Sequence, residues 1–256
     1  MEWLVNILVS NGGERAIATL IAAVVPLLFY WLFVLIYAIV PKWFPAHAKK
    51  YKIQASSTSD HHSGSGILIS GGVLLNIVCN QLFFVIGLFW VLYPLLVWRG
   101  CLLSLSRLPS FPEAIGHVVL LFLIQDTLFY WLHRVLHMGW VYKRIHRYHH
   151  QFSSPTGVCA NVAHPVEYLV AFALPIAVGI ILLGTHFVVF SLFLSLMFLH
   201  NVHTHCGYNY PWDITSLLTS NDVTLHDDHH DCNHGNYSGG VTDWWDRLCG
   251  TKINKK

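Results

Sequence analysis

The chain has 256 residues, of which 54% are apolar and only 11% are charged, and its mean hydropathy is +0.50. A soluble domain of this size carries roughly a quarter charged residues, so the composition excludes a disordered chain and argues against an ordinary cytosolic enzyme. The formal net charge of +2 is too small for a nucleic-acid-binding protein, which needs a clustered basic face.

Three apolar stretches predict the first membrane spans. Residues 16–40 contain no charge and exceed the roughly 20 residues that cross a bilayer. A second span lies within residues 67–98, and a third runs from about residue 114 to residue 132. The chain is therefore expected to be an integral membrane protein.

The last apolar stretch, residues 166–200, is too long for one untilted crossing. Because Gly184 and Thr185 lie near its middle, we expect two shorter helices that form a hairpin. With that topology twelve of the 15 basic residues lie on one side of the membrane, which the positive-inside rule makes cytoplasmic. The sequence thus predicts an all-α bundle of about four spans, the last of them a helical hairpin.

Histidine is unusually abundant, with 18 in the chain and fourteen between residues 133 and 234. Three groups have the spacings H-x-x-x-H, H-x-x-H-H and again H-x-x-H-H, and residues three or four apart share one helical face. Each group can therefore direct two or three imidazoles at one point, and together they exceed the needs of a single zinc ion. We predict a site for two metal ions. The grouped residues are His133, His137, His146, His149, His150, His226, His229 and His230.

The ligand type leaves the metal open, since imidazole suits zinc, copper, iron and nickel. Two irons surrounded by imidazoles can use dioxygen to oxidise an unactivated C–H bond, which suits a lipid substrate. A zinc-dependent membrane hydrolase is the alternative from a different class. A transporter fits less well, because its histidines would lie near the bilayer midplane on broken helices. The hairpin topology places all three groups on the cytoplasmic side.

The ordered motifs resemble the fatty acid hydroxylase superfamily of membrane di-iron oxygenases over about residues 114–251. The segment W-L-H-R-V-L-H at residues 131–137 looks like the first histidine box of that superfamily. The segment Y-K-R-I-H-R-Y-H-H at 142–150 looks like the second box, and H-D-D-H-H at 226–230 looks like the third.

The motifs between and after the boxes resemble those of different subfamilies. A-H-P-V-E at residues 163–167 and W-W-D-R-L-C-G-T at 244–251 resemble sterol C4-methyl oxidases. H-C-G-Y at 205–208 is more like sphinganine hydroxylases. The longer C-terminal match favours oxidation of a sterol, with a C4 methyl group as the leading target. A sterol 25-hydroxylase or a sphinganine C4-hydroxylase remains the alternative.

The resemblance also implies the cofactors and the surroundings of the enzyme. It implies two iron ions, dioxygen, and electrons from NAD(P)H delivered by a separate protein such as cytochrome b5 with its reductase. It implies a multi-pass protein of the endoplasmic reticulum membrane, with the active site facing the cytoplasm. Residues 1–113 would hold N-terminal spans and loops, and residues 114–256 the catalytic region, within a single integrated membrane domain.

The same resemblance assigns roles to individual side chains. All eight grouped histidines are expected to be catalytic iron ligands, and His205 becomes a ninth ligand by its motif. His164 and His203 are candidates for metal binding or for a hydrogen bond to a ligand. Asp126 and Asp227 are candidate acceptors for the N–H groups of ligating imidazoles.

Overall fold

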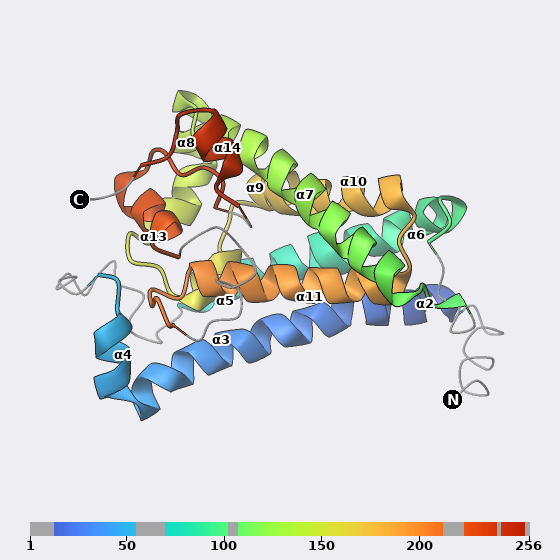
Figure 1. Ribbon diagram of the computed structural model, residues 1–256, viewed down its shortest axis with the longest axis horizontal. Coiled ribbons are helices and arrows are strands. Elements are labelled where there is room, and N and C mark those ends of the chain that lie inside the picture. Colours follow the sequence, from blue (N-terminus) through green and yellow to red (C-terminus); the bar gives the residue numbers. More distant parts are fainter. Residues whose placement is uncertain (1–12, 55–69, 102–106, 212–222, 240–241, 254–256) are drawn as a thin grey trace.

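The computed structural model describes residues 13–54, 70–101, 107–211, 223–239 and 242–253 (Figure 1). Within these ranges the regular elements are helices, and an isolated β-bridge joins Lys52 and Tyr208. This confirms the prediction of an all-α protein.

Five helices in the described part of the chain are long and apolar enough to cross a membrane. They correspond to the predicted spans, because each arm of the predicted hairpin is a helix of its own; residues 67–69 of the second predicted span lie outside the described residues. In chain order the spans consist of α2 (Glu14–Thr19) with η1 (Leu20–Val24) and α3 (Val25–Trp43), α5 (Gly71–Asn80) with η2 (Gln81–Gly87) and α6 (Leu88–Trp98), α7 (Phe111–Leu136), α9 (Pro165–Glu167) with η6 (Tyr168–Ala173) and α10 (Leu174–Leu183), and α11 (Phe187–Thr204).

Short helices connect and follow these spans. Most of them gather at the left of Figure 1, around the end of α7. They are α4 (Pro45–Tyr51), α8 (Gly139–Arg144), the 3₁₀ helices η4 (His146–Gln151) and η5 (Gly157–Asn161), α13 (Val223–Cys232) and α14 (Trp244–Leu248).

Prolines explain two of the three π-helical turns, η1 and η6. Pro26 and Pro175 have no N–H to donate to the carbonyl four residues earlier, and in each case that carbonyl lies in the π-helical turn. The turn widens instead, so that an N–H reaches the carbonyl five residues back, as Leu174 does with Leu169. A wider turn shifts the direction of the side chains that follow it.

Helix α11 is the centre of the bundle. It packs along α3 and also contacts α7, η5 and α13 (Figure 1). In its most apolar 18-residue segment, 67% of the residues are buried, whereas in that of α7 only 22% are buried. The other spans therefore enclose α11. Phe193, Phe198 and Val202 on α11 and Tyr30 on α3 are fully buried in the core. This packing determines where the C-terminal end of α11 lies.

The hairpin between α10 and α11 turns at Gly184, where the sequence predicted the interruption. Gly184 adopts φ +60°, and a Cβ atom there would lie 2.6 Å from the main-chain oxygen of Arg99. The Arg99 guanidinium donates to the carbonyls of Ile181 and Leu182 at 2.9 and 3.2 Å, which satisfies the last turn of α10. The start of α9 and the end of α11 are thereby brought to the same end of the bundle.

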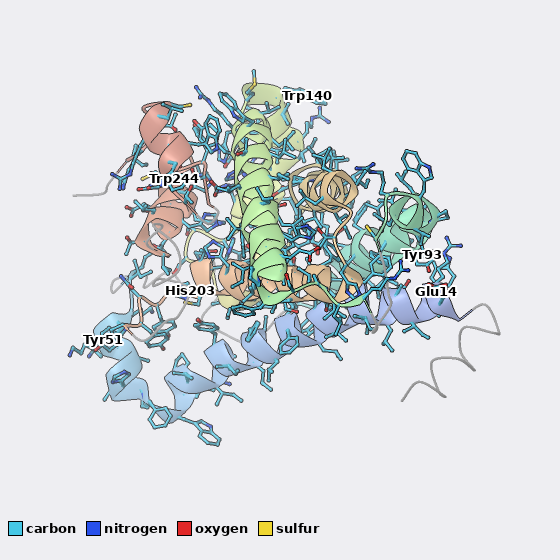
Figure 2. All side chains as sticks on the ribbon, turned by 45° about the vertical axis from the view of Figure 1, so that its right-hand side comes forward. Glu14, Tyr51, Tyr93, Trp140, His203 and Trp244 are labelled. Atoms are coloured by element: carbon cyan, nitrogen blue, oxygen red, sulfur yellow. The ribbon has the colours of Figure 1, made fainter. Side chains whose placement is uncertain are left out.

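Figure 2 shows that the two ends of the bundle differ. Glu14 and Tyr93 lie at one end, whereas Tyr51, His203 and Trp244 lie toward the other. The end of α7, the start of α9 and the end of α11 all approach this second end, together with α13 (Figure 1).

Candidate metal centre

Nine histidines form two groups at this end of the bundle. In each group the ligand atoms, one ring nitrogen from each histidine, all lie within 4.8 Å of one another. The structure therefore brings together every histidine that the motifs named as a metal ligand. The first group is His133, His137, His146, His150 and His229, and the second is His149, His205, His226 and His230.

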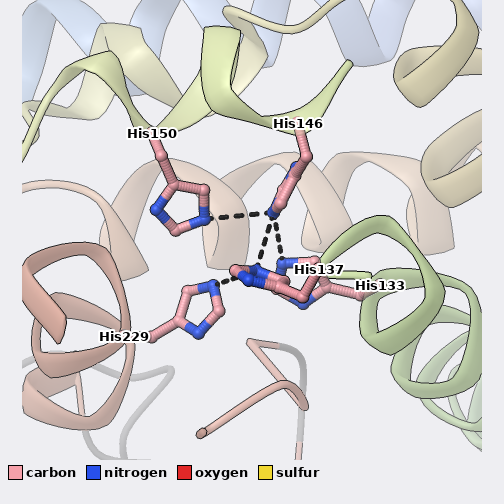
Figure 3. Close-up of side chains that lie close together, drawn as sticks. All are labelled: His133, His137, His146, His150 and His229. Atoms are coloured by element: carbon pink, nitrogen blue, oxygen red, sulfur yellow. Dashed lines mark hydrogen bonds between the residues drawn. The ribbon is translucent and has the colours of Figure 1, made fainter. Parts of the chain in front are cut away.

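The first group joins three elements (Figure 3). His133 and His137 lie one turn apart at the end of α7, His146 and His150 belong to η4, and His229 belongs to α13. The Nε2 atom of His146 lies 2.9 Å from the Nε2 atoms of His133 and His137 and 3.0 Å from that of His150. The Nε2 atoms of His137 and His229 are 3.1 Å apart. The five imidazoles thus point to a common centre.

The second group lies beside the first and is wholly buried. His205, directly after α11, places its Nε2 atom 3.0 Å from that of His226 and 3.4 Å from that of His149. The ring of His230 lies 4.7 Å from the ring of His149, and neither of its nitrogens has a hydrogen-bond partner in the described part of the chain. A buried nitrogen of this kind is costly unless a ligand occupies the space it faces.

Each H-x-x-H-H motif is divided between the two groups. The sequence had predicted that all the imidazoles of one motif point to the same place. The histidines four residues apart stay together: His146 and His150 belong to the first group, and His226 and His230 belong to the second. The middle histidines, His149 and His229, cross to the opposite group. Consecutive helical residues point roughly 100° apart, so neighbours in sequence cannot face one centre. The division links η4 and α13 through both groups.

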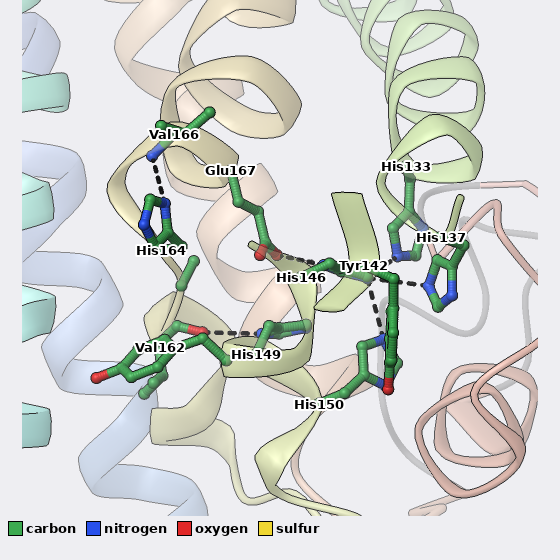
Figure 4. Close-up of polar contacts among 12 residues, drawn as sticks. His133, His137, Tyr142, His146, His149, His150, Val162, His164, Val166 and Glu167 are labelled. Carbon is green, nitrogen blue, oxygen red and sulfur yellow. Dashed lines mark hydrogen bonds and ion pairs between the residues drawn. The ribbon is translucent and has the colours of Figure 1, made fainter. Parts of the chain in front are cut away.

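Main-chain carbonyls hold four of the imidazoles by their Nδ1 atoms. Each of these Nδ1–H groups donates, which leaves the Nε2 atom as a bare acceptor that points into the group (Figure 4 shows the pair of His149 and Val162). The donors and acceptors are His133 to Tyr237 at 2.7 Å, His149 to Val162 at 2.9 Å, His205 to Asn201 at 2.8 Å, and His229 to Gly235 at 2.6 Å.

A carboxylate lies against a fifth imidazole. Glu167 on α9 is buried, and its Oε1 atom lies 2.9 Å from the Nδ1 atom of His146 (Figure 4). In the sequence, Glu167 belongs to the A-H-P-V-E motif. It is the one acidic residue in the apolar stretch 166–200, and that isolation is the signal that could have identified it as a partner of a site.

The donor set fits a metal ion. The acceptor Nε2 atoms of His133 and His229 converge with the other imidazole nitrogens of the first group, an arrangement that a cation between them would stabilise. A metal bound to imidazole at about 2.1 Å would place neighbouring ligands about 3.0 Å apart at right angles and about 3.4 Å apart at a tetrahedral angle. The separations of 2.9, 3.0 and 3.1 Å in the first group are compatible with ligands of one ion, and its five imidazoles suit a metal that takes more than four ligands.

The grouped imidazoles of His149, His226, His229 and His230, which lie outside the membrane spans, are neutral at physiological pH. Burial lowers the pKa of His149 to about 4, and burial likewise lowers that of His229 to about 4. Burial, together with the charge that neighbouring imidazoles would carry, holds the pKa of His226 and His230 well below the ordinary value. Metal ligation requires this neutral form.

Comparison with known proteins identifies the family of the chain. Residues 118–251 match the family model described as fatty acid hydroxylase. The chain belongs to the fatty acid hydroxylase family. This confirms the resemblance drawn from the histidine boxes, and with it the prediction of an oxidoreductase of the monooxygenase type.

Relatives with curated names cover most of the chain. It is 34% identical to methylsterol monooxygenase 2-2 of Arabidopsis thaliana over 202 residues, which are 76% of this chain and 72% of the relative. It is 33% identical to a very-long-chain aldehyde decarbonylase of Oryza sativa subsp. japonica over 207 residues, 79% of this chain and 74% of that one. It is 31% identical to fatty acid hydroxylase domain-containing protein 2 of Macaca fascicularis over 227 residues, 88% of this chain and 65% of the relative. No solved structure matches the chain.

Two further histidines that the sequence proposed for this hydroxylase site lie outside both groups. The Nδ1 atom of His164 accepts the N–H of Val166 at 3.2 Å and so caps α9 (Figure 4). The Nδ1 atom of His203 lies 3.1 Å from the hydroxyl of Tyr37. Both histidines thus have contacts in the helix packing around the site.

The two aspartates proposed as acceptors for imidazole N–H groups have other hydrogen-bond donors. Asp126 accepts the N–H and the hydroxyl of Thr242 at 3.0 and 2.6 Å, which ties the C-terminal segment to α7. Asp227 accepts the side-chain amide of Gln54 at 2.7 Å. Main-chain carbonyls accept the Nδ1–H groups of four of the grouped imidazoles, and Glu167 lies beside a fifth.

A cavity of about 60 Å³ borders both histidine groups. His133 and His146 of the first group and His149 of the second form part of its wall, and it exceeds the space of one water molecule. The rest of the wall comes from the residues Phe129, Ala160, Asn161, Ala163, Glu167, Tyr168, Ala171, Phe172, Asn201, His205, His226 and Gly239. A small molecule in this cavity would touch both groups.

Proposed function

We propose that this member of the fatty acid hydroxylase family is a di-iron, dioxygen-dependent monooxygenase that oxidises a sterol, with a C4 methyl group as the leading target. The observation that carries the proposal is the pair of adjacent groups, five and four imidazoles, that border one cavity. Similarity to a methylsterol monooxygenase over 76% of the chain supports the sterol.

Under this proposal each histidine group holds one iron ion. The bound irons would supply the activation of dioxygen that oxidation of an unactivated C–H bond requires. The chain itself holds the imidazoles in place through four main-chain carbonyls and Glu167, so the ligands are oriented before the metal arrives. The aromatic side chains of Phe129 and Phe172 limit the entry of water into the cavity.

We further propose that electrons come from NAD(P)H through a separate protein such as cytochrome b5 with its reductase. Exposed Lys143, Arg144 and Arg147 flank the buried His146 at the surface of the histidine-bearing end. A basic surface there favours an acidic electron carrier. We also propose residence in the endoplasmic reticulum, which the resemblance to sterol oxidases supports, with this end in the cytoplasm, which the distribution of basic residues supports.

The test is an assay of the purified protein in lipid nanodiscs. Metal analysis should find iron, about two ions per chain. With cytochrome b5, its reductase, NADPH and dioxygen, a 4-methyl sterol should be converted to its hydroxymethyl product. Bound zinc with oxygen-independent hydrolysis of a lipid would replace this proposal with the hydrolase. Hydroxylation of sphinganine without sterol turnover would refute the sterol and leave the monooxygenase.

Sidedness has its own test. A glycosylation acceptor sequence placed after residue 252 should stay unmodified in microsomes, whereas one near Ser110, at the start of α7, should be glycosylated. Glycosylation after residue 252 would contradict the cytoplasmic location of the histidine-bearing end.

A further inference from the structure

A second cavity lies between the spans, and we refer to it as the apolar chamber. Its volume is about 40 Å³, and its wall is formed only by apolar side chains from four of the five spans. Among them are Ala22, Val85, Leu92, Ile176 and Phe190. Leu92 and Ala177 keep part of their surface exposed, so the chamber extends toward the outer face of the bundle.

All three π-helical turns of the described chain border this chamber. Ala22 belongs to η1, Phe84 and Val85 belong to η2, and Phe172 and Ala173 belong to η6. These three turns are far apart in sequence, yet η2 contacts both η1 and η6. A π-helical turn is rare and is frequently found at functional sites. Their meeting at one apolar space indicates a built binding site.

Phe172 forms the boundary between the chamber and the cavity beside the histidines, because its side chain borders both. Its ring packs against Tyr168 at 5.0 Å and against Phe198 at 5.4 Å, centre to centre. Phe198 is fully buried, whereas Phe172 is only half-buried. The ring of Phe172 is therefore the less confined part of this aromatic wall.

We infer that the apolar chamber receives the apolar body of the sterol substrate and that Phe172 is the gate through which its reactive end reaches the metal centre. This inference rests on the proposed function. Both spaces lie far below the roughly 300 Å³ of a typical small-molecule site. Entry of a sterol therefore requires the Phe172 ring to turn aside and the two spaces to join.

The walls of the two spaces also orient the substrate. The cavity has polar groups in its wall, including Asn161 and Glu167, whereas the chamber has none. A sterol carries its only hydroxyl on the ring that includes C4. Its hydroxyl end therefore favours the cavity, where the C4 methyl groups meet the histidine groups, and its hydrocarbon tail favours the chamber.

The experiment changes the size of the gate. Phe172→Trp enlarges the side chain and narrows the passage between the two spaces, whereas Phe172→Ala opens the passage. Phe172→Leu opens it less and serves if Phe172→Ala fails to fold. Phe122→Trp and Phe122→Ala are the matched controls, since Phe122 is also a half-buried aromatic residue of the core but borders neither space. Each protein is purified in nanodiscs and its metal content is measured.

Two readouts follow, turnover and labelling. Phe172→Trp should lower kcat/KM for a 4-methyl sterol about ten-fold or more at unchanged metal content, because a small displacement of the reactive carbon costs this much. Phe172→Ala or Phe172→Leu should raise the turnover of a 4,4-dimethyl sterol relative to that of the 4-methyl sterol. A sterol with a photoreactive group on its tail should label residues 84–92 or 172–177. The Phe122 variants should stay within about two-fold of the wild type.

The outcomes separate the two claims. If the wild type converts the sterol but the Phe172 variants behave like the Phe122 variants, the inference is overturned and the proposed function stands. Labelling outside the chamber by an active enzyme overturns the inference as well. If the wild type oxidises no sterol but the probe labels the chamber and Phe172→Trp abolishes that labelling, the gate is supported and the proposed function fails.

Discussion

Both ends of the helical bundle contain main-chain carbonyls without a helical N–H partner, but different side chains donate to them. At the end that carries the α10–α11 turn, guanidinium groups donate. Pro94 leaves the carbonyl of Trp90 without its helical partner, and Arg15 donates to that carbonyl while its guanidinium stacks 4.5 Å from the Trp90 ring. Arg99 does the same for the last turn of α10.

At the opposite end, imidazoles donate to the carbonyls. His133 and His229 donate to Tyr237 and Gly235 in the C-terminal segments. A guanidinium has donors only, so its bonding ends with the carbonyl. A neutral imidazole that donates through Nδ1 still has an acceptor at Nε2. The same backbone requirement is therefore met by donors alone at one end, and at the other end it orients the imidazoles of the candidate metal centre.

The largest expected effect is on the histidine-bearing end. His229→Ala removes one of the five donors of the first group, and we expect loss of iron from that group and a fall in sterol turnover of at least about a hundred-fold. Iron content and turnover of the purified variant measure it. His234→Ala is the control, because this exposed histidine belongs to neither group. Full activity of His229→Ala would contradict the metal proposal.

Glu167→Gln tests whether the Glu167 carboxylate contributes to iron affinity in addition to the main-chain carbonyls that accept from the imidazoles. His146 would lose its charged partner, so iron affinity of the first group should fall about ten- to a hundred-fold while the fold persists. Competition with a chelator measures the affinity. Glu113→Gln is the matched control, since Glu113 is exposed at the far end of α7. Equal affinities in the two variants would show that His146 needs no carboxylate.

Gly184→Ala tests the end that carries the turn. The new methyl group would meet the Arg99 carbonyl in a backbone conformation that favours glycine, so stability should fall by about 1–3 kcal/mol. Unfolding in mixed micelles measures it, and iron affinity should stay at the wild-type value. Gly116→Ala, with nothing within 4 Å of its Cβ position, should leave stability unchanged or raise it. A large loss of iron in Gly184→Ala would show that the ends are coupled.

Arg99→Met should have the smallest effect. It removes two exposed hydrogen bonds to the end of α10, which we expect to lower stability by about 1 kcal/mol without affecting the metal. The same unfolding assay applies. Arg107→Met, a change at an exposed arginine nearby in sequence, should leave stability unchanged. Identical stability of both variants would show that water caps α10 equally well.

Local features of the sequence determined most of the architecture. The length of apolar runs predicted the spans, because a helix must cover the bilayer thickness with uncharged residues. Gly184 predicted the hairpin, since a glycine there permits a left-handed turn. The spacing and the order of the motifs also indicated all nine histidines that meet at the site, because histidines four residues apart, such as His133 and His137, share a helical face.

Only the tertiary structure decided how these histidines are divided and what holds them. The crossing of His149 and His229 between groups depends on how η4 and α13 face each other, which no local pattern records. The carbonyls of Tyr237 and Val162 act through atoms that every residue possesses, so their role has no sequence signal. The apolar chamber exists because three π-helical turns from separate spans meet, and a contact between distant segments is a property of the packed chain.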